Sequence, residues 1–127
     1  MNVIHLTEEE FLNRVADYRY PQAEWRYFGN RPAIVDFYAG WCGPCRALGP
    51  VLEEIATKYG GEIYVYKVDV DQCEAVADAY DIRSIPTTFF IPMKGRPVKM
   101  VGAISKGEIE RQIKDVLLKN ELHHAEV

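Results

Sequence analysis

The sequence has no excess of basic residues, no long apolar run and no stretch that resembles a targeting signal. A formal net charge of −4 gives no reason to expect a nucleic acid or an anionic membrane as partner. No apolar run approaches transmembrane length. Residues 1–5 lack the charged and apolar regions of a signal peptide, so we expect either that none exists or that it has been removed.

Metal-ligating residues are also scarce. A structural zinc site needs four ligands. The candidates are three cysteines and three histidines, none of them at a metal-like spacing from a second pair: Cys42, Cys45, Cys73, His5, His123 and His124. We therefore expect no metal site, and the chemistry must be sought elsewhere.

The composition is ordinary for a globular protein, with 48% hydrophobic and 27% charged residues. A chain of 127 residues is long enough to bury a single core, and it contains no repeat, low-complexity segment or linker. We therefore expect one domain over residues 1–127, with an additional segment at about residues 18–30.

Two cysteines lie three positions apart in Trp41-Cys42-Gly43-Pro44-Cys45. The apolar run 33–39 before them is typical of a strand buried on both faces. The residues after them repeat apolar side chains at helical spacing, and Gly60-Gly61 follows that pattern. The pair is therefore predicted at a strand-to-helix junction, where Cys-x-x-Cys indicates a redox pair rather than a zinc half-site or a permanent disulfide.

This position has chemical consequences. Free N–H groups and the positive end of the helix dipole favour a thiolate at the first turn, so Cys42 is the expected nucleophile. Cys45 lies one turn further along the same face, is expected to be more buried, and would be the resolving thiol. Pro44 suits a first turn because its missing N–H costs nothing there, and Gly43 lets a partner backbone approach closely.

The remaining elements alternate along the chain. Thr7-x-x-Glu10 predicts a capped helix to about residue 18, and Asp71-x-x-Glu74 predicts another to about residue 80. Strands are expected at 62–69, at 87–91 and, after a turn at Gly95, at 98–101. A last helix after Ser105 would turn four apolar side chains inward: Ile109, Ile113, Val116 and Leu117. This order predicts an α/β fold, a central mixed sheet with helices on both faces.

One charged residue, Asp36, lies inside the apolar run 33–39. Burying an unpaired carboxylate is costly and raises its pKa. The residue is either a buried base that moves a proton to or from Cys45, or a polar residue in contact with water at the sheet edge. We favour the buried base.

The segment from Val35 to Cys45 resembles the active-site segment of the thioredoxin family. The similarity continues over about residues 31–120, through Lys67-Val68-Asp69, Ile82-Arg83-Ser84-Ile85-Pro86-Thr87 and Val101-Gly102-Ala103. The association of Cys-x-x-Cys with redox chemistry is itself drawn from thioredoxin, so the motif and the resemblance are not independent. The resemblance implies the thioredoxin fold.

The resemblance also implies roles for residues outside the cysteine pair. Asp36 would be the proton relay, with Lys67 as its partner. Pro86 would follow a cis peptide bond and lie beside the cysteines, which leaves the backbone of Ile85 free to pair with an extended substrate. The implied substrate surface is flat and mostly apolar: Gly40, Trp41, Pro44, Ile85, Pro86, Gly102 and Ala103.

The function implied is protein-disulfide reduction, because Gly43-Pro44 between the cysteines matches the reducing members of the superfamily. The chain would bind no cofactor, and a thioredoxin reductase would supply electrons from NADPH. We expect a cytoplasmic monomer whose partners are protein disulfides. The alternatives are an oxidase or isomerase outside the cytosol, which a removed signal peptide would make periplasmic, and a non-catalytic binding module of the same fold.

Two features do not follow from the resemblance. Residues 18–30 add about ten residues, with five aromatic side chains in eleven positions, and Pro21 could open a short helix there. The segment is predicted to pack locally on the body, with an interaction surface as the alternative. Cys73 is the odd thiol, predicted to be free, partly buried and structural, with a regulatory or dimer-forming role as the alternative.

Overall fold

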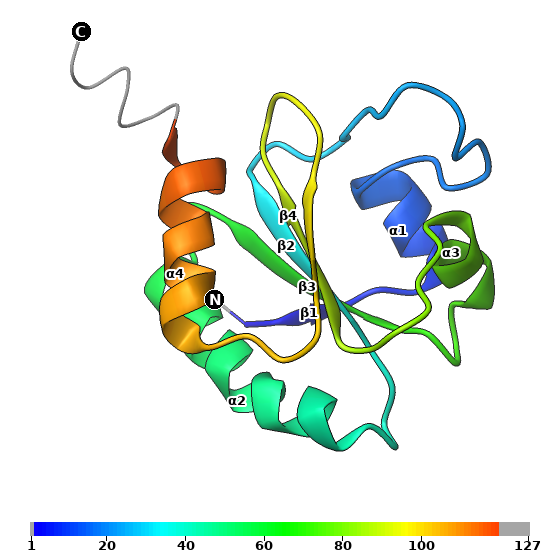
Figure 1. Ribbon diagram of the computed structural model, residues 1–127. Helices are drawn as coiled ribbons and strands as arrows, with labels where there is room; N and C mark the ends of the chain where they lie inside the picture. The colour runs from blue at the N-terminus through cyan, green and yellow to red at the C-terminus, as the bar shows by residue number, and fades with distance from the viewer. Residues whose placement is uncertain (1, 120–127) are drawn as a thin grey trace, which may run out of the picture.

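A five-stranded mixed sheet forms the centre of the computed structural model, which describes residues 2–119 (Figure 1). The strand order is β1-β3-β2-β4-β5. Strands β1, β3 and β2 are parallel, whereas β4 is antiparallel to β2 and to β5. The strands are β1 (Ile4–His5), β2 (Ala33–Tyr38), β3 (Tyr64–Asp69), β4 (Thr87–Ile91) and β5 (Val98–Val101).

Helices cover both faces of this sheet, as the sequence predicts (Figure 1). Those on one face are α1 (Glu8–Arg14) and α3 (Glu74–Ala79), and those on the other are α2 (Gly43–Lys58) and α4 (Lys106–Gln112), which continues as a π-helical turn η1 (Ile113–Leu117). Within residues 2–119, no helix is long and apolar enough to cross a membrane.

The central strand β2 is buried on both faces. Val35 and Phe37 pack in the core under α1 and α3, while Ile34 packs in the core under α2 and α4. Because side chains alternate along a strand, Asp36 lies on the same face as Ile34, beneath α2. β2, which ends at Tyr38, therefore places the Asp36 carboxylate inside the core on the α2 side of the sheet.

The first helix begins as predicted but ends four residues early. Thr7 and Glu10 form the predicted capping box. The helix stops at Arg14, and the Asp17 carboxylate then accepts hydrogen bonds from the backbone N–H of Arg19 at 3.1 Å and from its guanidinium at 2.9 Å. An aspartate that bonds the backbone two residues on offers an alternative to the helix, so the predicted extension to residue 18 was wrong.

The predicted cap of α3 is also wrong. Cys73 occupies the N-cap position and its side chain caps nothing. The carboxylate of Glu8, from α1, instead accepts hydrogen bonds from the N–H of Ala75 at 2.8 Å and of Val76 at 3.3 Å. Glu8, which is distant in sequence, therefore accepts hydrogen bonds from the free N–H groups at the start of α3 and links this helix to α1.

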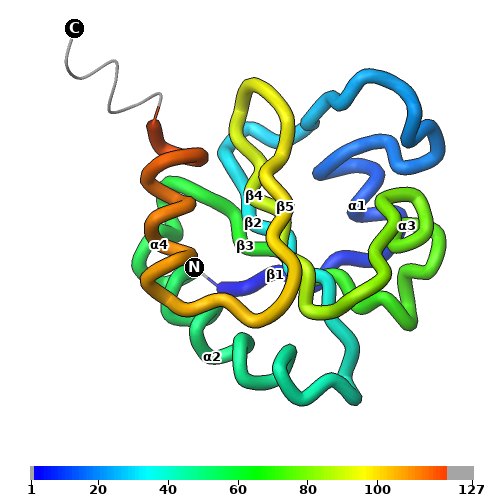
Figure 2. Tube along the Cα trace, viewed as in Figure 1, coloured from blue at the N-terminus to red at the C-terminus, as the bar shows by residue number. Residues whose placement is uncertain are grey.

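The segment that connects α1 to β2 contains no helix, so the predicted short helix at residues 21–28 was wrong. The segment arches beside α1 and the β4–β5 hairpin (Figure 2). It is held by the Phe28 N–H, which donates to the Val15 carbonyl at 2.9 Å, and by the Tyr27 hydroxyl, which donates to the Arg31 carbonyl at 2.6 Å. Long-range packing of its aromatic side chains outweighs the local helix signal.

The C-terminal helix follows the prediction more closely. Ser105 caps it, and Ile109, Ile113 and Leu117 are buried against the sheet. Val116 is partly buried at the edge of the same cluster. The predicted hairpin turn is present too, with Gly95 at a φ of 90° that a glycine adopts readily.

Candidate functional site

The two cysteines are joined by a disulfide at the start of α2. Cys42 is the N-cap residue, and the Cys45 N–H points at its sulfur, with a nitrogen-to-sulfur distance of 3.3 Å. The pair is covered by the protein, with 5% of Cys42 and 1% of Cys45 exposed. When the disulfide is reduced, this N–H and the helix dipole stabilise negative charge on the Cys42 sulfur.

A second segment lies directly against the pair. The Ile85 carbonyl oxygen is 3.8 Å from the Cys42 sulfur, and the Ile85–Pro86 peptide bond is cis. The carbonyl of Pro86 accepts a hydrogen bond from the Gly102 N–H at 2.8 Å, which brings the loop after β5 beside it. Within residues 2–119, Ile85 makes no backbone-to-backbone hydrogen bond, so an incoming strand can pair with it.

Among the large apolar side chains of residues 2–119, Trp41 is the most exposed, at 69%. Its indole N–H donates to the Asp71 carboxylate at 2.9 Å, which fixes the ring beside the cysteines. An added Cβ at Gly40 or Gly43 would meet only open space. Pro44 and Ala103 are exposed as well, so this surface is open and largely apolar.

Asp36 is fully buried, and no atom within residues 2–119 donates a hydrogen bond to its carboxylate. Its neighbour in the sheet register is Lys67, whose ammonium nitrogen lies 3.9 Å from one carboxylate oxygen. Burial raises the pKa of Asp36 from its ordinary value of 3.8 to about 6, against the opposing effect of the Lys67 charge. The alternative of a polar residue in water at the sheet edge was wrong, since β2 is the central strand.

Thr88 on β4 was not predicted as a site residue. It lies opposite Asp36 in the antiparallel register and is fully buried. Its hydroxyl has no hydrogen-bond partner within residues 2–119, and neither have the two Asp36 oxygens. Three buried polar atoms on neighbouring strands therefore share one unsatisfied environment. A second threonine in the apolar run 87–91 was the available signal.

Asp71 was also missed as a site residue. The capping interpretation assigned its side chain to α3, whereas the structure pairs it with Trp41. Asp71 thus contacts the motif through Trp41, and Thr88 faces Asp36 on the neighbouring strand. Neither pairing follows from spacing along the chain, because the two residues of each pair are far apart in sequence.

The third cysteine packs in the core under α1 and α3 and not in the cluster that contains the pair. Cys73 is free and buried, and its thiol donates to the Leu6 carbonyl at 3.6 Å. Burial raises the pKa of the Cys73 thiol, and Glu8 and Asp69 add to that effect. Among residues 2–119, no three side chains of His, Cys, Asp or Glu gather as a metal site requires. His123 and His124 lie outside the described residues.

Comparison with known proteins shows which family the chain belongs to. The thioredoxin family model matches residues 2–115. A thioredoxin of Borreliella burgdorferi is 46% identical over 112 residues, which is 88% of this chain and 95% of that protein. A thioredoxin of Mycobacterium tuberculosis is 45% identical over 89 residues, covering 69% of this chain and 76% of that protein. A chloroplastic M-type thioredoxin of Spinacia oleracea is 39% identical over 98 residues, covering 75% of this chain and 54% of that protein.

Proposed function

Because the chain belongs to the thioredoxin family and is a protein-disulfide reductase with a Cys42–Cys45 redox pair, we propose that Cys42 is the attacking thiol and Cys45 the resolving thiol. The observation that carries this assignment is the Cys45 N–H directed at the Cys42 sulfur from the first turn of α2. Cys42 is also the sulfur that faces the open segment at Ile85. A partner disulfide that approaches over that segment meets Cys42 first.

The exchange has two steps. The Cys42 thiolate attacks one sulfur of the partner's disulfide, so that bond breaks, a mixed disulfide forms, and the partner's other sulfur leaves as a thiolate. The Cys45 thiol then gives up its proton and attacks Cys42, which forms the Cys42–Cys45 disulfide and releases the second partner sulfur. The partner gains two electrons and the pair loses two.

Asp36 accepts the proton of Cys45 in the second step. Its burial on the α2 side of the sheet and its raised pKa support this role, because a base whose pKa is near the working pH can both take and return a proton. Lys67, 3.9 Å away, limits that rise and keeps the carboxylate titratable. The proton passes directly or through one water.

The substrate surface consists of the open residues around Cys42. An extended partner segment pairs with the free backbone of Ile85 beside Pro86. Trp41, Gly40 and Pro44 contact it on one side and the loop with Gly102 and Ala103 on the other. Gly43 leaves space for its backbone.

The oxidised pair is regenerated by a thioredoxin reductase that draws on NADPH, and the chain itself binds no cofactor. We place this cycle in the cytoplasm, where thiols are kept reduced, and the free thiol of Cys73 is compatible with such a compartment. We further propose that the chain acts as a monomer and that its residues fold as one thioredoxin domain.

A trapping experiment tests the assignment. Cys45→Ser retains the nucleophile and removes the resolving thiol, so disulfide-linked adducts with client proteins should accumulate on Cys42 and vanish on addition of dithiothreitol. Cys42→Ser should trap none. If the two thiols had the opposite roles, Cys42→Ser would trap adducts and Cys45→Ser would trap none. If the protein were a binding module without redox chemistry, neither variant would trap adducts.

A further inference from the structure

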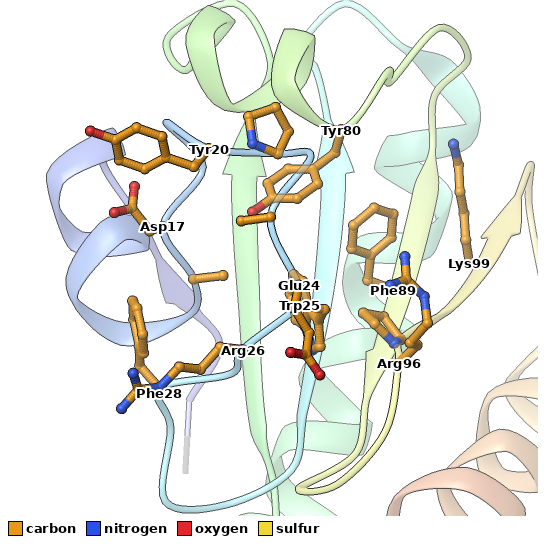
Figure 3. A pocket seen from close by; sticks show the side chains of 14 residues that line it. Asp17, Tyr20, Glu24, Trp25, Arg26, Phe28, Tyr80, Phe89, Arg96 and Lys99 are labelled. Atoms are coloured by element: carbon orange, nitrogen blue, oxygen red, sulfur yellow. The ribbon is translucent and has the colours of Figure 1, made fainter.

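A cavity of about 480 Å³ lies under the segment that connects α1 to β2 (Figure 3). Its walls come from that segment, from Tyr80 after α3 and from the β4–β5 hairpin. None of its lining residues belongs to the cysteine site. It sits beside the residues that lead into β2, whereas the cysteines follow the other end of that strand.

The cavity exists because helices cover only part of this face of the sheet. Phe89 and Lys99 are opposite each other on β4 and β5 and both line the cavity, and the connecting segment closes over them in place of a helix. The floor is aromatic. Trp25 meets Tyr80 edge-on at 6.1 Å between ring centroids, and Tyr80 meets Phe89 at 5.9 Å.

One polar group in this wall lacks a partner. The indole N–H of Trp25 is buried, and nothing within residues 2–119 accepts its hydrogen bond. A buried donor without an acceptor costs about 1–3 kcal/mol of unfavourable free energy, so the packing of Trp25 leaves one hydrogen bond unmade in this wall.

The rim of the cavity is basic on a chain of net charge −4. Arg96 and Lys99 lie on the hairpin side and form no ion pair within residues 2–119 (Figure 3). Arg26 lies 5.9 Å above the Phe28 ring. Two carboxylates also line the cavity, but Asp17 is neutralised by Arg19 at 2.9 Å, which leaves Glu24 against three cations.

We propose that this cavity is a second docking site, which binds an acidic, aromatic-bearing segment of a partner protein. An aromatic side chain of the partner packs on the floor that Trp25, Tyr80 and Phe89 form, and its flanking carboxylates face Arg96 and Lys99. A protein segment fits better than a free small molecule because two of the lining rings are open to solvent, with 64% of Tyr20 and 43% of Phe28 exposed. Aromatic and arginine side chains together are typical of interface anchor points.

Binding at this cavity leaves the redox pair accessible. Because no lining residue belongs to the surface around Cys42, a partner held here leaves the cysteines open to its own disulfide or to a reductase. The segment of residues 18–30 then raises the local concentration of one class of client. Binding of the acidic segment at this cavity does not itself require the chemistry of the cysteines.

The test uses the full chain and follows the indole N–H resonances of its two tryptophans by NMR. The probe is a capped peptide of one phenylalanine between glutamates, and the comparison is the same peptide with lysines. We expect the acidic peptide to shift the Trp25 resonance saturably and to leave Trp41 unmoved, while the basic peptide shifts neither. The double substitution Arg96→Glu and Lys99→Glu should weaken binding about tenfold or more.

Lys114→Glu and Glu62→Lys are controls, since both residues are exposed and neither lines the cavity. They should leave the affinity within about twofold, as expected for charges remote from an interface. Equal shifts from acidic and basic peptides, no shift of Trp25, or equal binding of free phenylacetate would each overturn the proposal. No thiol reacts in this measurement, so its failure leaves the reductase function intact.

Discussion

The Lys67 ammonium lies 3.9 Å from the Asp36 carboxylate, close enough to attract it but too far for a good hydrogen bond. The carboxylate receives no hydrogen bond from any described residue and is fully buried. Desolvation therefore outweighs the attraction, and the pKa of Asp36 rises from 3.8 to about 6. A buried carboxylate with a raised pKa lowers the free energy of unfolding at neutral pH, where it is ionised.

Asp36→Asn should therefore stabilise the protein. Between pH 4 and pH 6 the folded chain retains a proton that the unfolded chain has lost, so the free energy of unfolding falls as pH rises through this range. The substitution removes that loss and should raise the free energy of unfolding at pH 7 by up to about 3 kcal/mol, since each pKa unit corresponds to about 1.4 kcal/mol. Urea denaturation at pH 4 and pH 7 measures the difference.

The same substitution should slow the resolution of mixed disulfides and abolish the rise of its rate with pH around pH 6. Asp69→Asn is the control, because Asp69 is partly exposed at the end of β3 and its side chain caps only the following turn. A stability gain that is equal at both pH values would contradict the account of Asp36.

Thr88→Val should shift the titration of Asp36. The Thr88 hydroxyl and both Asp36 oxygens are buried without partners on facing strands, and such groups are commonly bridged by ordered water. Loss of the hydroxyl should raise the pKa of Asp36 by about one further unit, the equivalent of one hydrogen bond to a charge. Carboxyl NMR titration measures it. Thr88→Ser keeps the hydroxyl and should restore the original value; a Val variant that titrates as the parent would refute the link.

Asp71→Ala should weaken the binding of protein disulfides. The substitution removes the 2.9 Å hydrogen bond that fixes the exposed Trp41 ring. We expect the KM for a protein disulfide to rise roughly threefold to tenfold, as loss of one hydrogen bond implies, with kcat unchanged. Asp71→Asn retains an acceptor oxygen and should keep the parental KM. A change confined to kcat would show that the bond acts on chemistry instead.

Glu8→Ala should destabilise the fold by about 1 kcal/mol, the usual cost of losing a helix cap. The reason is that Glu8 accepts from the N–H groups of Ala75 and Val76 at the start of α3. Glu9→Ala removes a carboxylate from the same turn of α1 and should change stability by less than about 0.5 kcal/mol. Thermal unfolding of both variants compares the two, and equal losses would mean that only the dipole of α1 matters.

The sequence predicted the parts of this molecule that depend on local patterns. The strand before Cys42, the helix after Cys45 and the β4–β5 hairpin follow from apolar periodicity and turn residues, and the structure confirms them. Strand β1 was missed because two residues carry no detectable period, and its pairing with β3 depends on tertiary contact.

The errors share one physical cause, which is competition from residues distant in sequence. Asp71 matches a capping box but bonds Trp41, and Glu8 takes its place at α3. Pro21 matches a helix start, yet Trp25 packs on Tyr80 and draws the segment into an extended path. The Thr88 hydroxyl is informative only once the register places it opposite Asp36. Such pairings need the folded structure.

The reduction potential of the Cys42–Cys45 pair tests the central claim most directly, by equilibration in glutathione buffers of defined ratio. Thioredoxins have a potential of about −270 mV, whereas isomerases of the same superfamily lie near −180 mV and strong oxidases near −120 mV. A reductase supplied by a thioredoxin reductase should give a value close to −270 mV. A value of about −180 mV or above would contradict the account and indicate an oxidase or isomerase.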